Sequence, residues 1–125
     1  MNEEKRRFQR YYHPFEVEYS PKGNGIIYSA SISKNISKGG ICLPVLSRLV
    51  RTGDPIKIDI YPDNDGKDPV SLHGEVMWTR ETTSAANPSS LDAEAGIRFV
   101  GSDESLIDKL LAKIPSFESE LEYTA

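Results

Sequence analysis

The chain has 125 residues, of which 38% are hydrophobic, and this size and composition suit one domain with a single core. It contains no apolar run near the roughly 20 residues needed to cross a bilayer, and its N-terminus lacks the apolar block of a signal peptide. The one cysteine, Cys42, cannot form an internal disulfide and favours a reducing compartment. We therefore expect a soluble, cytoplasmic protein without membrane insertion.

The formal net charge of −4 is unevenly distributed along the chain. Residues 1–40 contain seven Lys/Arg and four Asp/Glu (+3), whereas residues 41–125 contain eight Lys/Arg and fifteen Asp/Glu (−7). Binding to long nucleic acid depends on many phosphate contacts, so an acidic chain is a poor general binder of it. A small anion drawn to the basic N-terminal end fits this distribution better.

The first predicted element is a basic arm, residues 1–14, in which positive charge is concentrated between Lys5 and Arg10. Pro14 blocks the continuation of a helix, so the arm and the following strand are expected to be separate units. Arg6 and Arg10 supply forked cationic donors that fit phosphate oxygens or the O6/N7 edge of a guanine. Taken alone, the arm is explained equally well as a solvated charged terminus.

The next part of the chain is predicted to be mostly β-structure. Phe15–Tyr19 and Ile56–Tyr61 alternate apolar and charged residues, which is typical of strands with one solvent-exposed face. Gly74 is a candidate β-bulge where the sheet bends, and residues 82–91 are expected to form a mobile loop. Short antiparallel strands separated by turns favour a barrel, because closure removes exposed edges. The six expected strands cover residues 15–19, 26–32, 41–43, 56–61, 70–78 and 95–100.

A polar turn, residues 35–40, lies between the second and third expected strands. Asn35 and Ser37 can hydrogen-bond a base edge or a ribose, and Gly39 and Gly40 let the backbone turn sharply beside a ligand. The arm and this turn, in this order and followed by strand-like sequence, predict a two-part site for an anionic, guanine-bearing ligand. The candidate binding residues are Arg6, Arg10, Asn35, Ser37, Gly39 and Gly40.

Towards the C-terminus the pattern changes from β to helical periodicity, which completes a domain over residues 15–114. Ser102 or Asp103 can cap the helix, and Pro115 ends it. The apolar stripe of the helix is expected to pack on the barrel. Residues 115–125 form an acidic tail that we expect to be disordered. The stripe consists of Leu106, Ile107, Leu110, Leu111 and Ile114.

Residues that carry catalytic or metal chemistry are sparse. His13, His73 and Cys42 do not have the spacing of a metal cluster, and Cys42 is expected to be a small buried hydrophobe. The chain has no phosphate-gripping glycine loop of the P-loop or dinucleotide-fold type. The aspartates between Asp63 and Asp68 lack the twelve-residue calcium pattern with its closing glutamate. We expect no enzymatic activity, no catalytic residue, no metal and no cofactor.

Arg6-x-x-x-Arg10 and Asn35-x-Ser37-x-x-Gly40 resemble the RxxxR and [D/N]xSxxG signatures of the PilZ domain family, bacterial receptors for cyclic di-GMP (c-di-GMP). The order of the two motifs, the β-barrel pattern between and after them, and the terminal helix all agree with that family. The later segments GEVMW and AGIRF also resemble its strands.

The resemblance implies a six-stranded antiparallel PilZ-type β-barrel with a C-terminal α-helix, which holds the nucleotide on its outer surface. It also implies that Arg6 and Arg10 grip phosphates and guanine, while Asn35, Ser37 and Gly40 contact the other face of the nucleotide. Ligand would order the arm and so change the surface shown to an unidentified protein partner. The family's usual outlets are motility, pilus function and exopolysaccharide production.

Two other functions stay open from the sequence. A PilZ-like domain that no longer binds nucleotide would act through protein contacts alone, although the intact motifs, within a similarity covering nearly all of residues 4–114, count against it. A small barrel for single-stranded nucleic acid would need several exposed aromatic residues along a basic groove. The sequence shows no such cluster on a basic background.

Several further side chains near the motifs have two interpretations. Trp78 is expected in the core, and Gly96 is expected to serve packing. Arg80 and Arg98, on or after late strands, could instead face the ligand. The arm residues expected to pack against the barrel, with purine contact as the alternative, are Tyr11, Tyr12 and His13.

Overall fold

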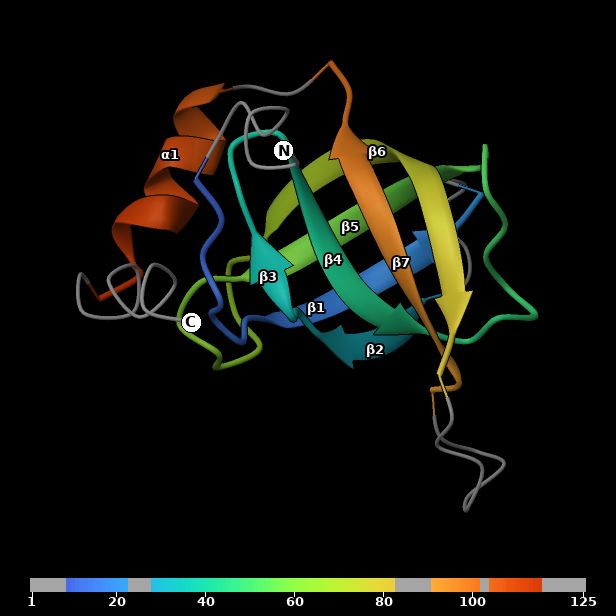
Figure 1. Ribbon diagram of the computed structural model, residues 1–125. Coiled ribbons are helices and arrows are strands. Elements are labelled where there is room, and N and C mark those ends of the chain that lie inside the picture. Colours follow the sequence, from blue (N-terminus) through green and yellow to red (C-terminus); the bar gives the residue numbers. More distant parts are fainter. Residues whose placement is uncertain (1–8, 23–27, 83–90, 102–103, 116–125) are drawn as a thin grey trace.

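The computed structural model describes residues 9–22, 28–82, 91–101 and 104–115, which form a curled antiparallel sheet with one helix (Figure 1). The expectations for Arg6, for the loop between residues 83 and 90, and for the tail after Pro115 lie outside the described residues. The elements are β1 Glu16–Pro21, β2 Ser29–Ile32, β3 Asn35–Ile36, β4 Gly40–Val45, β5 Pro55–Tyr61, β6 Val70–Glu81, β7 Ala93–Phe99 and α1 Glu104–Ala112.

The strands form one sheet in the order β2-β1-β5-β6-β7-β4-β3, which curls into a half-barrel. The predicted fold class is thereby confirmed, with seven strands in place of six. The additional strand is β3, because Asn35 and Ile36 pair with Cys42 and Ile41 of β4. Near the two ends of the sheet, the Ser31 hydroxyl of β2 donates to the Pro44 carbonyl of β4 at 2.6 Å.

Alternating side chains of the strands build the core. In β5 the residues Ile56, Ile58 and Ile60 are buried, while the residues between them are partly exposed, as the sequence pattern predicts. On α1, Ile107 and Leu110 are buried, and Leu106 and Leu111 pack against the core from its margin. The helix stripe therefore packs on the barrel, as predicted.

Strand β6 departs from simple alternation. The pairing of β6 with β7 shifts in register between Val76 and Trp78, which is the signature of a β-bulge. Met77 and Trp78 are consequently both exposed, and the expectation that Trp78 lies in the core is wrong. The bulge is not at Gly74, which stays in register; a Cβ there would lie 2.5 Å from Ile97 Cγ2.

The end of the N-terminal arm is held against β3. Tyr11 N–H donates to the Ile36 carbonyl at 2.8 Å, and Ile36 N–H donates to the Tyr11 carbonyl at 2.9 Å. The buried Ser33 holds residues 13–15, which follow. Its hydroxyl donates to the His13 carbonyl at 2.7 Å and accepts from Phe15 N–H at 2.9 Å. These bonds place Arg10, the residue directly before Tyr11, beside β3.

The described part of the chain contains no helix with the length and apolar character needed to span a membrane.

We predict that Ser33→Ala destabilises the protein by about 1–3 kcal/mol, because it removes two hydrogen bonds of a buried hydroxyl. Urea unfolding followed by circular dichroism measures the loss. Ser71→Ala is the matched control, since its hydroxyl makes one exposed bond to Asp59, and we expect a change within about 0.5 kcal/mol. Equal stability of the two variants would show that Ser33 does not anchor the arm.

Candidate functional site

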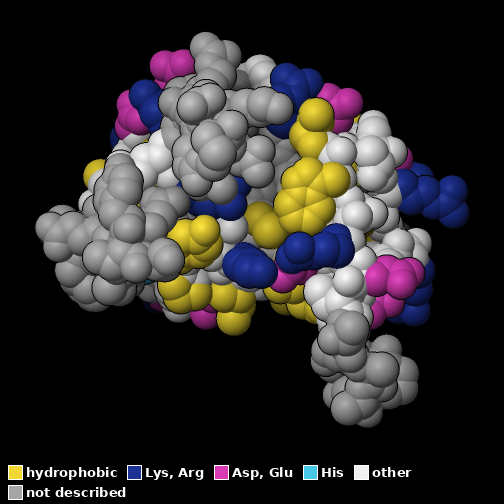
Figure 2. Space-filling model, in the orientation of Figure 1, with side chains coloured by type: hydrophobic (Ala, Val, Ile, Leu, Met, Phe, Trp, Pro, Cys, Tyr) yellow, Lys and Arg dark blue, Asp and Glu magenta, His cyan; other side chains and the backbone are white. Residues whose placement is uncertain are grey.

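The described residues form a groove of about 670 Å³ on the outer face of β3, β4, β7 and the second half of β6. Figure 2 shows this face, on which hydrophobic side chains are flanked by Lys and Arg. The volume lies in the range of small-molecule sites. It is lined by residues of four strands, of the arm and of the turns on either side of β3: Arg10, Tyr12, Lys34, Asn35, Ser37, Gly39, Gly40, Ile41, Cys42, Met77, Trp78, Arg80, Glu94, Gly96, Ile97 and Arg98.

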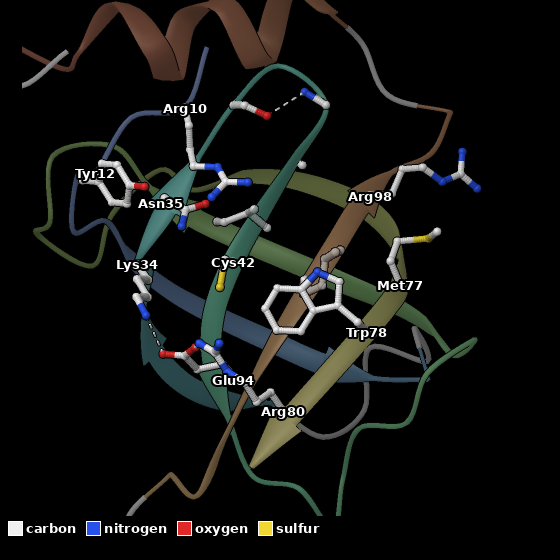
Figure 3. A pocket seen from close by; sticks show the side chains of 16 residues that line it. Arg10, Tyr12, Lys34, Asn35, Cys42, Met77, Trp78, Arg80, Glu94 and Arg98 are labelled. Atoms are coloured by element: carbon white, nitrogen blue, oxygen red, sulfur yellow. Dashed lines mark hydrogen bonds and ion pairs between the residues drawn. The ribbon is translucent and has the colours of Figure 1, made fainter. Parts of the chain in front are cut away.

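Five of the six predicted binding residues line this one groove, although they come from the arm and from the polar turn. Arg10 and Asn35 lie side by side at one end, and the Arg10 guanidinium points towards the groove (Figure 3). The pairing of Tyr11 with Ile36 explains this, because it sets the arm and β3 antiparallel to each other. The sixth residue, Arg6, lies outside the described part of the chain.

Hydrogen bonds and a close backbone approach fix the polar turn. Ser37 N–H donates to the Gly40 carbonyl at 2.8 Å, and Gly39 N–H donates to the Ser37 hydroxyl oxygen at 3.2 Å. The Gly39 carbonyl accepts from Phe99 N–H at 2.9 Å, which ties the turn to β7. A Cβ at Gly40 would lie 2.2 Å from the Ile97 carbonyl oxygen, so this position excludes every side chain.

Trp78 forms a large apolar surface in the groove, and it is a site residue that the sequence analysis missed. Its side chain lies directly over Gly96, where a Cβ would approach the indole Nε1 to 2.2 Å. Gly96 therefore serves packing, as expected, by letting the indole lie against β7. Trp78 is 43% exposed and Met77 is 48% exposed, so both present apolar surface to solvent. An exposed indole is a favourable platform on which a nucleobase can stack.

The arm residues divide between packing and the groove. Tyr11 packs against the core, and the His13 ring meets Phe15 edge to face with 4.5 Å between centroids, as expected. Tyr12 instead lines the groove and is 45% exposed. Within the described ranges, the groove thus carries two exposed aromatic side chains, Tyr12 and Trp78, next to basic residues.

The charges of the groove are mainly positive. Arg10, Lys34, Arg80 and Arg98 all line it, so the ligand-facing alternative for Arg80 and Arg98 agrees with their position. Lys34 is a further cation that the sequence analysis did not single out. An exposed indole beside several guanidinium groups suits an anionic, aromatic ligand.

Three ion pairs, made with two carboxylates, hold cations of the groove in place. Arg98 Nη2 lies 2.7 Å from Glu75 Oε1, on the neighbouring strand. Arg80 Nη2 lies 2.5 Å from Glu94 Oε1, and Lys34 Nζ lies 3.0 Å from Glu94 Oε2. The hydrogen bond from Arg80, together with that from Lys34, lowers the pKa of Glu94. This carboxylate is accordingly ionised at neutral pH.

Cys42 lies at the floor of the groove, between its strand partners Asn35 and Gly96. It is 8% exposed, so the expected burial is seen. Burial raises the pKa of the Cys42 thiol, and the nearby charge of Glu94 adds to this increase. The thiol is therefore mainly protonated at neutral pH and a poor nucleophile.

A second hollow, of about 720 Å³, lies over β1 and β2 and contains none of the predicted binding residues. Its lining includes Val17, Ile32, Pro44 and Tyr61 and is mainly apolar. Nowhere in the described ranges do three or more His, Cys, Asp or Glu side chains gather in a way that could hold a metal ion.

Comparison with known proteins identifies the family and the fold of the chain. A sequence model of the PilZ domain family matches residues 4–114. No curated protein matches the chain in sequence. Among solved structures, the PilZ domain of YcgR from Escherichia coli, determined with c-di-GMP, is similar with a TM-score of 0.64 and 16% identity, over 96% of each chain.

Two further structures have the same fold. The Bacillus subtilis inhibitor of motility, MotI/DgrA, gives a TM-score of 0.65 at 16% identity, covering 96% of this chain and 52% of that one. The PilZ domain of CeSA from a cellulose-synthesizing bacterium gives a TM-score of 0.55 at 13% identity, covering 90% of this chain and 97% of that one. The chain therefore spans about half the length of MotI/DgrA, and identities this low show a shared fold alone.

We predict that Gly96→Ala forces the indole of Trp78 away from β7, because the added methyl group would overlap it. We expect a loss of about 1–3 kcal/mol in stability, as for other overpacked positions, without loss of the fold. Trp78 is the one tryptophan of the chain, so its fluorescence maximum and its quenching by acrylamide report the movement directly. An unchanged emission spectrum and quenching constant would contradict the packing described for this pair.

Proposed function

This chain belongs to the PilZ domain family, and we propose that it is a receptor for cyclic di-GMP rather than an enzyme. The observation that carries the proposal is the convergence of Arg10 with the polar turn, residues 35–40, on one groove beside the exposed indole of Trp78. The YcgR domain with a similar fold was determined with c-di-GMP, which supports the same ligand class here.

Each part of the groove suits one part of such a ligand. Arg10 presents two parallel N–H donors to a phosphate or to the O6/N7 edge of a guanine. Asn35 and Ser37 offer short polar side chains to a base or a ribose. Arg6, four residues earlier in the sequence, is proposed as the second arginine of the pair. Trp78 offers a stacking surface to a base.

The charge distribution favours a small anion over a long one. Four cationic side chains of the described residues line the groove, whereas the chain as a whole carries a net charge of −4. An extended nucleic acid would have to cross the acidic remainder of the surface, at an electrostatic cost that grows with its length. A cyclic dinucleotide places both of its phosphates within the basic groove and avoids that cost.

Binding would change the arm, residues 1–14, and thereby signal to a protein partner. The turn that carries Ser37 is also linked to α1, since Lys38 Nζ lies 3.6 Å from Asp108 Oδ1. A ligand that orders the arm over the turn would alter the surface next to the helix. We propose a cytoplasmic receptor module that acts on such a partner in motility, pilus or exopolysaccharide control.

A groove for single-stranded nucleic acid is the second candidate, and one observation favours it. Tyr12 and Trp78 are exposed next to basic residues, which is the arrangement that such a groove requires and that the sequence did not reveal. The limited volume of the groove, about 670 Å³, and the acidic remainder of the chain favour the cyclic dinucleotide. A PilZ-like adaptor that binds no nucleotide is the third candidate.

We predict that Arg10→Ala weakens the binding of cyclic di-GMP at least about tenfold, because a charge-assisted, forked contact contributes about 1.5–3 kcal/mol. Arg6→Ala is expected to have a similar effect. Isothermal titration calorimetry with cyclic di-GMP measures both, with GMP and a short oligonucleotide as competing ligands for the wild type.

The matched control is Arg51→Ala, an exposed arginine that does not line the groove, for which affinity is expected to stay unchanged. Wild-type affinity in both Arg6 and Arg10 variants would contradict the assigned roles. Tight oligonucleotide binding without a response to cyclic di-GMP would favour the second candidate, and no binding of either ligand would favour the adaptor.

A further inference from the structure

Glu94 is the one residue with a carboxylate among the described side chains that line the basic groove. It comes from β7, where it pairs with Pro44 of β4 and with Arg80 of β6. A carboxylate in a groove built for an anion is unfavourable unless the ligand itself offers hydrogen-bond donors at that place. The position of Glu94 therefore indicates that the ligand has hydrogen-bond donors at this place.

The Glu94 carboxylate is held in a fixed position. Its Oε1 accepts from Arg80 Nη2 at 2.5 Å, and its Oε2 accepts from Lys34 Nζ at 3.0 Å. The side chain is 12% exposed, whereas both cations are about half exposed or more. Each carboxylate oxygen has two lone pairs, so one acceptor position on each oxygen is left by these two bonds.

The carboxylate is also close to the stacking surface. The Arg80 guanidinium carbon lies 5.9 Å from the centroid of the Trp78 ring, and the same guanidinium is bonded to Glu94. A single guanidinium group thus separates the indole from the carboxylate (Figure 3). A base stacked on Trp78 would have one edge near Glu94, at the end of the groove away from Arg10 and Asn35.

We propose that Glu94 is a specificity-determining residue, which selects guanine by accepting hydrogen bonds from the N1–H and N2–H₂ groups of the base stacked on Trp78. The proposal rests on the proposed function and adds to it the recognition of the second base. In this arrangement Arg80 and Lys34 are positioning residues, because they hold the carboxylate at the edge of the base.

The hydrogen-bonding groups of the purines explain why a carboxylate would select guanine. Guanine presents two adjacent donors, N1–H and N2–H₂, to a carboxylate, and such charge-assisted bonds are about twice as strong as neutral ones. Adenine has an acceptor at N1 and no amino group at C2, so it would leave the carboxylate unpaired. Hypoxanthine keeps O6, N7 and N1–H but lacks the C2 amino group.

A comparison of guanine with hypoxanthine distinguishes the Glu94 contact from contacts made by arginine. An arginine that reads O6 and N7 does not distinguish guanine from hypoxanthine, because both bases present the same two acceptors there. Glu94 does distinguish them, because hypoxanthine lacks the C2 amino group, one of the two donors that guanine offers to the carboxylate. The ratio of affinities for cyclic di-GMP and cyclic di-IMP therefore reports the Glu94 contact.

The experiment compares wild type, Glu94→Gln and Glu94→Asp by isothermal titration calorimetry against cyclic di-GMP, cyclic di-IMP and cyclic di-AMP. The amide of Glu94→Gln keeps the shape and loses the charge, whereas Glu94→Asp keeps the charge and shortens the reach. Glu18→Gln is the matched control, since its carboxylate accepts from the Tyr61 hydroxyl at 2.6 Å, away from the basic groove. Thermal melts confirm that each variant is folded.

We expect wild type and Glu18→Gln to prefer cyclic di-GMP over cyclic di-IMP by about tenfold or more, because a buried charged acceptor rejects a base that lacks its donor. In Glu94→Gln and Glu94→Asp we expect this ratio to fall towards one and the rejection of cyclic di-AMP to weaken.

Two results would overturn the inference. If Glu94 only neutralises Arg80 and Lys34, then Glu94→Gln changes the affinity for all three ligands by the same factor and leaves the ratio at its wild-type value. If wild type binds cyclic di-GMP and cyclic di-IMP with nearly equal affinity, Glu94 likewise does not select guanine. Both results leave the receptor function intact. Absence of any binding of cyclic di-GMP to the wild type would instead overturn the proposed function, and this inference with it.

Discussion

The candidate site depends on the pair of backbone hydrogen bonds between Tyr11 and Ile36. Because a bridge of two bonds is marginal by itself, the buried Ser33 and the core residue Phe15 reinforce it from the next turn of chain. Together these contacts place the end of the arm along one side of the groove and set Arg10 beside Asn35 (Figure 3). The attachment therefore joins the end of the arm to the sheet at one edge of the groove.

The strands contribute the floor of the groove and the carboxylates that hold several of its cations. Because Gly40 and Gly96 have no side chains, β4 approaches the β7 backbone closely and the Trp78 indole lies against β7. Lys34 and Arg80 are held by the carboxylate of Glu94 inside the groove, and Arg98 is held by Glu75 beside it. This arrangement reduces the entropy lost when a ligand is bound, because the side chains are already partly ordered.

Local pattern was enough to predict much of the fold, and the motifs were enough to predict one half of the site. Alternation gave β5, and helical spacing gave the buried face of α1. The position of Trp78 could not be predicted, because a one-residue bulge moves every later side chain to the other face of the strand. Lys34 and Glu94 were missed because they are 60 residues apart and meet only through the register of β3, β4 and β7.

The central claim is that the ligand occupies the groove between the arm and Trp78, and the most direct test is an amide and indole chemical-shift titration by NMR with cyclic di-GMP. The account predicts saturable shifts at Arg10, Ser37, Gly40 and the Trp78 indole N–H, with little change at Ile32 in the apolar hollow over β1 and β2. Shifts centred on that hollow, or none in the basic groove at saturating ligand, would contradict it.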